Sequence, residues 1–312
     1  MLTMEQVIAI IGPTAVGKTK VGIDLAKHLS TEIISGDSML IYRGMNIGTA
    51  KPDIAERSGI RHHLIDIRGA NDEYCVVDFQ KMAGELIYRI NSQQHIPILV
   101  GGTGLYVKSL LEGFKFSPIA GSDQLRNRLT ELVKVHGNEY LHNMLAKVEP
   151  VVAARLHPND QRRIIRALEI HFTGEDVPNE AKSSELIYDA VVIGLTMDRQ
   201  KLYDRINQRV DLMIRSGLVE EVDALLKTGV SPGAQSMQGI GYKEIVLYLQ
   251  GKVELPAAID KIKQATRNFA KRQLTWYRKM PYTCWVDVDN YKNHATLMEY
   301  IYNHIAGKFN RE

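Results

Sequence analysis

Cysteine is scarce in this sequence, and its scarcity excludes two kinds of site. The 312 residues include two cysteines, Cys75 and Cys284. Two cysteines cannot form a disulfide framework, and they cannot supply four zinc ligands by themselves.

Long apolar runs are also missing. No run approaches the roughly 18 residues that a transmembrane helix needs. The chain enters a short apolar run at residues 6–11 without the basic region and long apolar stretch of a signal peptide. We therefore expect no membrane span and a cytoplasmic protein.

An excess of charge of one sign is nearly absent from the whole chain but present in one segment. The formal net charge is +3, which says little about nucleic acid. Residues 261–280 contain seven basic side chains and no acidic one. Lys263, Arg267 and Lys271 are four apart, on one face of a helix. This spacing predicts a basic face suited to an RNA backbone.

Six short runs rich in β-branched residues alternate with helical patterns. This alternation is typical of an α/β fold with a parallel sheet and helices on both faces. Between residues 117 and 189 the strand signal vanishes and the spacing is helical. We expect a core formed by residues 1–118 and 190–312, with a helical insertion domain at 119–189. The six runs are residues 7–11, 31–35, 62–67, 96–100, 190–195 and 283–288.

A phosphate-binding loop follows the first run. The stretch GPTAVGKT matches G-x-x-x-x-G-K-[ST] between a strand and a helix, the pattern of nucleotide-binding and ATP-binding proteins. Its glycines let backbone N–H groups turn toward phosphate, Lys18 adds a positive charge and Thr19 a hydroxyl for Mg²⁺. The core is thus predicted to be P-loop NTPase-like. Its phosphate-binding residues are Gly12, Pro13, Thr14, Ala15, Val16, Gly17, Lys18 and Thr19.

The carboxylate that NTP-hydrolysing enzymes place after a later strand is missing from the strongest later run. Residues 96–100 lead into Gly101-Gly102-Thr103-Gly104, and Asp66 is a weaker candidate for that carboxylate. The glycine cluster indicates either a close backbone approach to a ligand or a simple tight turn. Asp37, after the second run, suits a general base or a helix N-cap, and the spacing alone leaves both open.

Several long stretches together closely resemble the tRNA dimethylallyltransferase family, the bacterial-type tRNA isopentenyltransferases. They are GPTAVGKT, DSMLIYRGMNIGTAKP, VGGTGLYVKSLLEG and HPNDQRRIIRALEI, followed by RINQRVDLMIRSGLVEEV, GIGYKE and ATRNFAKRQLTWYRK. The resemblance covers nearly the whole chain. It implies transfer of a dimethylallyl group from dimethylallyl diphosphate to N6 of the adenosine 3′-adjacent to the anticodon of tRNA. The loop would then hold dimethylallyl diphosphate rather than a nucleoside triphosphate.

The same resemblance implies roles for individual residues. Asp37 would take the proton of the amine, while Lys18 and a Mg²⁺ ion on Thr19 stabilise the leaving diphosphate. Arg209 would lie near the diphosphate, the alternative being a surface ion pair with Asp211 or Glu221. Many relatives carry Gln at the position of Leu40. The implied tRNA-binding residues are Asp37, Ser38, Met39, Leu40, Thr103, Arg126, Gln161, Arg162, Arg163, Ile164, Ile165, Gly239, Gly241 and Tyr242.

Two other functions fit the residues without the resemblance. A P-loop kinase for a small molecule would use the same loop, with Asp37 near its acceptor. A non-catalytic RNA-binding protein would use the basic helix and the insertion. Such a protein has no need of Lys18, Thr19 and Asp37 together, so we expect an enzyme.

The resemblance implies that the insertion holds the anticodon stem-loop. We also expect the protein to be a monomer.

Overall fold

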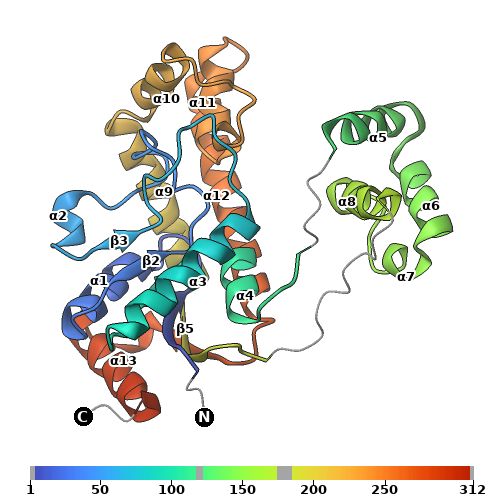
Figure 1. Cartoon of the computed structure of the whole chain (residues 1–312). Helices are drawn as coiled ribbons and strands as arrows, with labels where there is room; N and C mark the ends of the chain where they lie inside the picture. The colour runs from blue at the N-terminus through green and yellow to red at the C-terminus, as the bar shows by residue number, and fades with distance from the viewer. Residues whose placement is uncertain (1–3, 117–121, 174–184, 310–312) are drawn as a thin grey trace. The chain divides into compact units, whose positions relative to one another are not determined.

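The computed structural model describes residues 4–116, 122–173 and 185–309. Contacts within the chain divide it into two compact units (Figure 1). The first comprises the residues up to Gly113 and those from Ser184 onward, and the second comprises Phe114–Ser183. The candidate active site is built by the first unit.

A six-stranded sheet forms the centre of the first unit, in the order β3-β2-β4-β1-β5-β6. Every neighbouring pair is parallel, so the predicted α/β fold is confirmed. Each of the six predicted runs contributes a strand, but the run at 62–67 contributes only two residues. Leu64 and Asp66 take positive φ values of 61° and 57°, which ends the extended backbone. The strands are β1 (Gln6–Ile11), β2 (Ile33–Ser35), β3 (His62–His63), β4 (Ile98–Val100), β5 (Asp189–Thr196) and β6 (Thr283–Asp287).

Helices cover both faces of this sheet, because the strands alternate apolar side chains between two cores. In β1, Val7 and Ile11 belong to one core, while Ile8 and Ile10 belong to the other. The first core is shared with α3, α4, α10 and α11, and the second with α1 and α13, which contact each other (Figure 1). The helices of this unit are α1 (Lys18–His28), α2 (Ile54–Arg57), α3 (Val76–Ser92), α4 (Gly104–Leu111), α9 (Arg199–Arg215), α10 (Leu218–Lys227), η1 (Ser236–Gln238), α11 (Tyr242–Leu249), α12 (Leu255–Tyr277), η2 (Val288–Asn290) and α13 (His294–Phe309).

The second unit is helical in the residues that the structure describes. Its four helices enclose a small core around Leu129, Leu145, Ile164 and Leu168. They are α5 (Asp123–His136), α6 (Asn138–Val148), α7 (Pro150–Ala153) and α8 (Gln161–Phe172). Over the described ranges of both units, no helix combines the length and apolar character needed to cross a membrane.

Candidate active site

The phosphate-binding sequence forms a tight loop between β1 and α1. Gly12 has a φ of 143°, and a Cβ at this position would lie 2.5 Å from the carbonyl oxygen of Leu195. Gly17 has a φ of 106° and caps α1 without a side-chain hydrogen bond. The first turn of α1 therefore offers its backbone N–H groups and its positive dipole end to an anion.

A cavity of about 1070 Å³ adjoins this loop at the carboxyl edge of the sheet. Thr14, Lys18 and Thr19 of the loop line it together with Asp37 and Arg209. The fold therefore brings five of the eight predicted loop residues, together with Arg209 and the proposed base Asp37, into one cavity, while Gly12, Pro13 and Val16 are buried behind it. Residues 49–53, Leu40, Gly101 and Gly102 supply further parts of its lining.

Among the charged side chains that line the cavity, Lys18 and Arg209 are half-buried cations whose pKa values respond to Asp37. The Lys18 ammonium donates a 2.7 Å hydrogen bond to the carbonyl oxygen of Pro13. Burial lowers the pKa of Lys18 to about 7; Asp37 raises this pKa and Arg209 lowers it further. Burial also lowers the pKa of Arg209, and Asp37 again opposes the shift. A bound anion would offset the desolvation of both cations, so the cavity suits a diphosphate.

Arg209 is directed at the phosphate-binding loop. Its Nη1 lies 3.5 Å from Oγ1 of Thr14. The two carboxylates of the alternative interpretation are engaged elsewhere. Asp211 pairs with Lys263 at 2.6 Å, and Glu221 accepts the backbone N–H groups of residues 46–48.

Asp37 lies at the end of β2 and does not cap a helix. Its Oδ1 accepts the N–H of Met39 at 2.8 Å, an Asx turn, and the next described helix in sequence begins at Ile54. This removes the N-cap interpretation. The N–H of Ser38 donates to Oγ1 of Thr103 at 3.0 Å. Three residues expected around the adenine, Asp37, Ser38 and Thr103, are thus neighbours.

The remaining residues expected to bind tRNA in the first unit differ in accessibility. Leu40 lines the cavity, and Gly239 packs against Met39, whose Cε would lie 2.5 Å from an added Cβ. Gly241 is buried with a φ of 98°. Tyr242 is completely buried, and its hydroxyl donates to Glu221 at 2.6 Å. With its side chain enclosed, Tyr242 could contact tRNA only through its backbone.

The residues expected to bind tRNA in the second unit also differ in how accessible their side chains are. Arg162 and Arg163 are exposed, and Gln161 is half-buried. Ile164 and Ile165 face the core of this unit with exposed fractions of 0% and 8%, so their side chains are not available to RNA. Arg126 pairs through Nε with the buried carboxylate of Glu169 at 2.8 Å.

The predicted basic face of α12 turns partly toward α9. Lys263 pairs with Asp211, and Arg267 donates to Oδ1 of Asn207 at 2.6 Å. Lys271, the third member of the face, is exposed. The charge pattern correctly predicts the helix. Two of the three cations, however, bind side chains of the neighbouring helix α9 and do not point freely into solvent.

Two polar residues of the site carry no signal in the sequence. Gln273 is 4% exposed and joins the phosphate-binding loop to the glycine-rich loop after β4. Its Oε1 accepts the N–H of Thr14 at 2.8 Å, and its Nε2 donates to the carbonyl oxygen of Gly102 at 2.7 Å. Glu221 fixes the backbone of residues 46–48 beside the cavity. Both hold backbone groups more than 150 positions away, which no local pattern reveals.

A metal ion at this site would depend on oxygens of the ligand. Thr19 is exposed to the cavity, and Asp37, Asp53 and Glu56 line other parts of it. Within the described ranges no cluster of three or more His, Cys, Asp or Glu side chains is placed to hold a metal. Asp66, the weaker candidate from sequence, pairs with Lys51 at 2.5 Å. The donor set fits Mg²⁺, which commonly uses one or two protein oxygens together with substrate phosphates.

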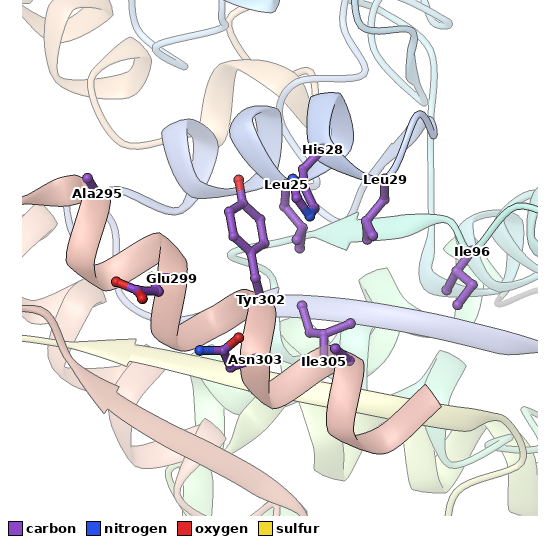
Figure 2. A pocket seen from close by; sticks show the side chains of 10 residues that line it. Leu25, His28, Leu29, Ile96, Ala295, Glu299, Tyr302, Asn303 and Ile305 are labelled. Atoms are coloured by element: carbon purple, nitrogen blue, oxygen red, sulfur yellow. The ribbon is translucent and has the colours of Figure 1, made fainter. Parts of the chain in front are cut away.

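A second cavity, of about 400 Å³, lies between α1 and α13 and has a different character. Figure 2 shows Leu25, Ile96 and Ile305 on its walls, with His28 stacked on Tyr302 at 4.0 Å between ring centroids. Ile96 precedes β4, so this cavity is at the amino edge of the sheet. Ligands of parallel α/β sheets bind at the carboxyl edge, where the first cavity lies.

The sequence profile of one family, described as IPP transferase, matches residues 40–280. The chain belongs to the IPP transferase family. The tRNA dimethylallyltransferase of Thermoanaerobacter sp. (strain X514) is 47% identical over 98% of this chain and 99% of its own length. That of Bacillus mycoides is 48% identical over 98% of this chain and 97% of its own length. The resemblance found from sequence motifs is thereby confirmed.

Solved structures of IPP transferases share the fold. The tRNA isopentenylpyrophosphate transferase of Bacillus halodurans is 46% identical, with a TM-score of 0.75, covering 98% of this chain and 97% of that one. A eukaryotic dimethylallyltransferase, described as acting on tRNA, is 28% identical with a TM-score of 0.79. That match covers 99% of this chain and 80% of the eukaryotic one. The fold of this chain is therefore shared with a bacterial and a eukaryotic transferase.

Proposed function

We infer that this protein transfers a dimethylallyl group from dimethylallyl diphosphate to N6 of the adenosine 3′-adjacent to the anticodon of tRNA (adenosine-37). The products are N6-dimethylallyladenosine and diphosphate. One observation carries the inference. In a chain of the IPP transferase family, Lys18 and Arg209 line the same cavity as Asp37. Anion-binding groups and a potential base are thus available to one reaction.

The phosphate-binding loop is proposed to hold the diphosphate. Backbone N–H groups at the start of α1, the Lys18 ammonium and the Arg209 guanidinium would stabilise negative charge as the bond between C1 and the diphosphate oxygen breaks. Mg²⁺ on the Thr19 hydroxyl and the phosphate oxygens would supply Lewis-acid stabilisation of the same leaving group. The low pKa of Lys18 in the free cavity supports this assignment, because an incoming diphosphate favours the charged lysine.

Asp37 is proposed to act as the general base. The exocyclic amine of adenine is a weak nucleophile, and the proton must leave N6 as the bond between N6 and C1 forms. Asp37 Oδ1 already accepts the N–H of Met39, which orients the carboxylate. Ser38, Met39, Leu40 and Thr103 are proposed to surround the adenine, which must leave its stack to reach the cavity.

The second unit is proposed to hold the anticodon stem-loop of the tRNA. The exposed side chains of Arg162 and Arg163 support this, since guanidinium groups are common contacts of the phosphate backbone. One chain supplies all the groups proposed for transfer, so we expect a monomer. As a tRNA-modifying enzyme, it is expected to act in the cytoplasm.

The two other functions considered from sequence differ in what they consume. A small-molecule kinase would hydrolyse or transfer from ATP, and a non-catalytic RNA-binding protein would consume nothing. The names of the curated relatives favour the transferase over both. We therefore propose no second function.

The test is direct prenylation of tRNA. Purified protein, Mg²⁺ and dimethylallyl diphosphate are incubated with unmodified tRNA whose anticodon is followed by adenosine, and the digested RNA is analysed by mass spectrometry. We expect one adenosine to gain the mass of a dimethylallyl group. Lys18→Ala should reduce the rate by at least about 10²-fold through loss of transition-state stabilisation.

Lys81→Ala is the matched control, because Lys81 is an exposed lysine on α3. Its activity should equal that of the wild-type protein. If added ATP is consumed and no adenosine gains the dimethylallyl mass, the result would instead support a kinase.

A further inference from the structure

Gln273 differs from the other polar residues of α12 in where its side chain lies. It is one of the few buried polar residues of the described chain, with an exposed fraction of 4%. Both ends of its amide are used: Oε1 accepts from the N–H of Thr14, and Nε2 donates to the carbonyl oxygen of Gly102. A buried amide whose acceptor and donor are both satisfied holds its two partners at a fixed separation.

Those two partners belong to different halves of the proposed reaction. Thr14 is in the loop proposed to hold the diphosphate, and its hydroxyl lies 3.5 Å from Nη1 of Arg209. Gly102 precedes Thr103, which accepts the N–H of Ser38 next to Asp37. A Cβ at Gly102 would lie 2.9 Å from Nε2 of Gln273 and 3.3 Å from Oδ2 of Asp37. Gln273 thus contacts both the phosphate-binding loop, called the donor loop below, and the backbone next to the proposed base.

The next turn of α12 supports the same loop. The hydroxyl of Tyr277 donates to the carbonyl oxygen of Gly101 at 3.3 Å. A Cβ at Gly104 would lie 2.3 Å from the Trp276 ring, so the loop backbone packs directly on that indole. The glycine-rich loop is therefore pressed against one face of α12, and Gln273 is the residue of that face that also reaches the donor loop.

We propose that Gln273 is a positioning residue that sets the separation between the donor loop and the acceptor side of the site by bridging Thr14 and Gly102. This inference rests on the proposed function and deepens it. Gln273 touches neither reacting group, so its contribution is expected in the transfer step and not in the binding of either substrate alone.

The first variant removes the bridge with little change in volume. Gln273→Met keeps an unbranched side chain of similar size but leaves the N–H of Thr14 and the carbonyl of Gly102 without their partner. A misplacement of reacting groups by about 1 Å can cost on the order of 10²-fold in rate, so we expect kcat to fall by about 10- to 100-fold. Each loop keeps its own ligand contacts, so KM for dimethylallyl diphosphate and for tRNA should change by less than about threefold.

The second variant restores the bridge under one condition only. In Gln273→Glu, a protonated carboxyl can donate its O–H to the carbonyl of Gly102 and accept the N–H of Thr14, as the amide does. The ionised carboxylate has no proton for Gly102. Burial and the facing carbonyl oxygen of Gly102 would favour the protonated form of a carboxyl at this position. The kcat of Gln273→Glu relative to wild type should therefore rise as the pH falls, while the ratio for Gln273→Met stays constant.

The control and the normalisation separate positioning from folding. Gln264→Met removes an exposed amide from the same helix and should leave kcat unchanged. Rates are expressed per binding site for dimethylallyl diphosphate, measured by calorimetry, so unfolded protein does not count. A Gln273→Met variant with kcat within about twofold of wild type would overturn the inference, since a bridge of this kind is expected to matter more.

The inference would also be overturned if the kcat of Gln273→Glu relative to wild type did not change with pH. Failure of the wild-type protein to prenylate tRNA counts against the proposed function instead. An active wild type with an equally active Gln273→Met variant counts against this inference alone.

Discussion

Lys18, Arg209 and Asp37 are three of the charged side chains that line the cavity, and the free-energy cost of desolvating the two cations points to their use. Lys18 and Arg209 are both desolvated, and neither forms an ion pair with a carboxylate within 4 Å among the described residues. Two such cations do not stabilise the fold, because removing a charge from water without a partner costs free energy. An anionic ligand removes that cost, so the arrangement is explained by what binds.

At the same scale, replacing Asp37 tests the proposed base. Asp37→Asn keeps the shape of the side chain and its ability to accept the N–H of Met39, but it cannot accept a proton from N6. We expect kcat to fall by about 10²- to 10⁴-fold, the usual contribution of a general base. Binding of tRNA, measured by fluorescence anisotropy, should change little. Asp260→Asn, an exposed carboxylate on α12, is the control. Near-normal turnover by Asp37→Asn would remove Asp37 from the proton transfer.

The pH profile tests Lys18. Its pKa of about 7 in the free cavity means that the ammonium loses its proton above that pH. Since kcat/KM reports the free protein, kcat/KM for dimethylallyl diphosphate should decline above about pH 7. Bound diphosphate favours the charged lysine, so the decline in kcat should lie at higher pH. In Lys18→Arg the guanidinium stays charged and this decline should vanish. A kcat/KM that is flat from about pH 6.5 to 9 would contradict the assignment.

The contiguous parts of the site could be predicted from the sequence, and the distant parts could not. The loop at residues 12–19 and Asp37 follow directly from strand ends, because parallel strands deliver their carboxyl ends to one edge. Gln273 is 259 positions from Thr14, and nothing in the basic stretch around it marks one amide as buried. Arg209 is predicted only through the family resemblance, because the sequence pattern of its helix does not show whether this side chain faces solvent or the cavity.

At the scale of single elements, the segment before α2 depends on one carboxylate. Glu221 on α10 accepts the backbone N–H groups of Asn46, Ile47 and Gly48 and the hydroxyl of Tyr242. Residues 46–53 of this segment contribute much of the cavity wall. The Tyr242 ring packs on Gly48, where an added Cβ would lie 2.5 Å from Cε2. This wall of the cavity is therefore held by two side chains, Glu221 and Tyr242, that do not line the cavity themselves.

Removing the Tyr242 hydroxyl tests this support. Tyr242→Phe leaves the ring in place and takes away a hydrogen bond to a charged group, so the free energy of unfolding should fall by about 1.5–3 kcal/mol. Urea denaturation followed by circular dichroism measures it. Tyr248→Phe, on the same helix but only half-buried, should cost less than about 0.5 kcal/mol. Equal stability of the two variants would show that the hydroxyl does not hold the segment.

Helix α12 and strand β3 show why local patterns mislead at this scale. Charge spacing on α12 correctly predicts a helix, but it cannot show that α9 presents Asp211 and Asn207 to two of the cations. The apolar run at 62–67 predicts a long strand, yet β3 ends at His63. There the chain turns so that Asp66 can pair with Lys51, a contact set by tertiary packing.

At the scale of the whole molecule, RNA binding must come from how charge is distributed, because the net charge is only +3. Arg126 is unsuitable as a probe, since it also pairs with the buried Glu169. Arg162 is exposed on α8, so its removal should affect little besides RNA. Under the proposed function, the groups for transfer and for the adenine lie in the first unit, and the second unit contacts the phosphate backbone of the anticodon stem-loop.

Salt dependence tests that division. Each phosphate contact releases counterions, so the logarithm of the tRNA association constant should fall linearly with the logarithm of salt concentration. Arg162→Gln should weaken binding and reduce the steepness of that line by about one contact. Lys227→Gln, in the first unit and paired with Asp223 at 2.6 Å, should leave the slope unchanged. If Arg162→Gln and wild type give the same slope, Arg162 makes no phosphate contact, and the assignment of the anticodon stem-loop to the second unit loses its main support.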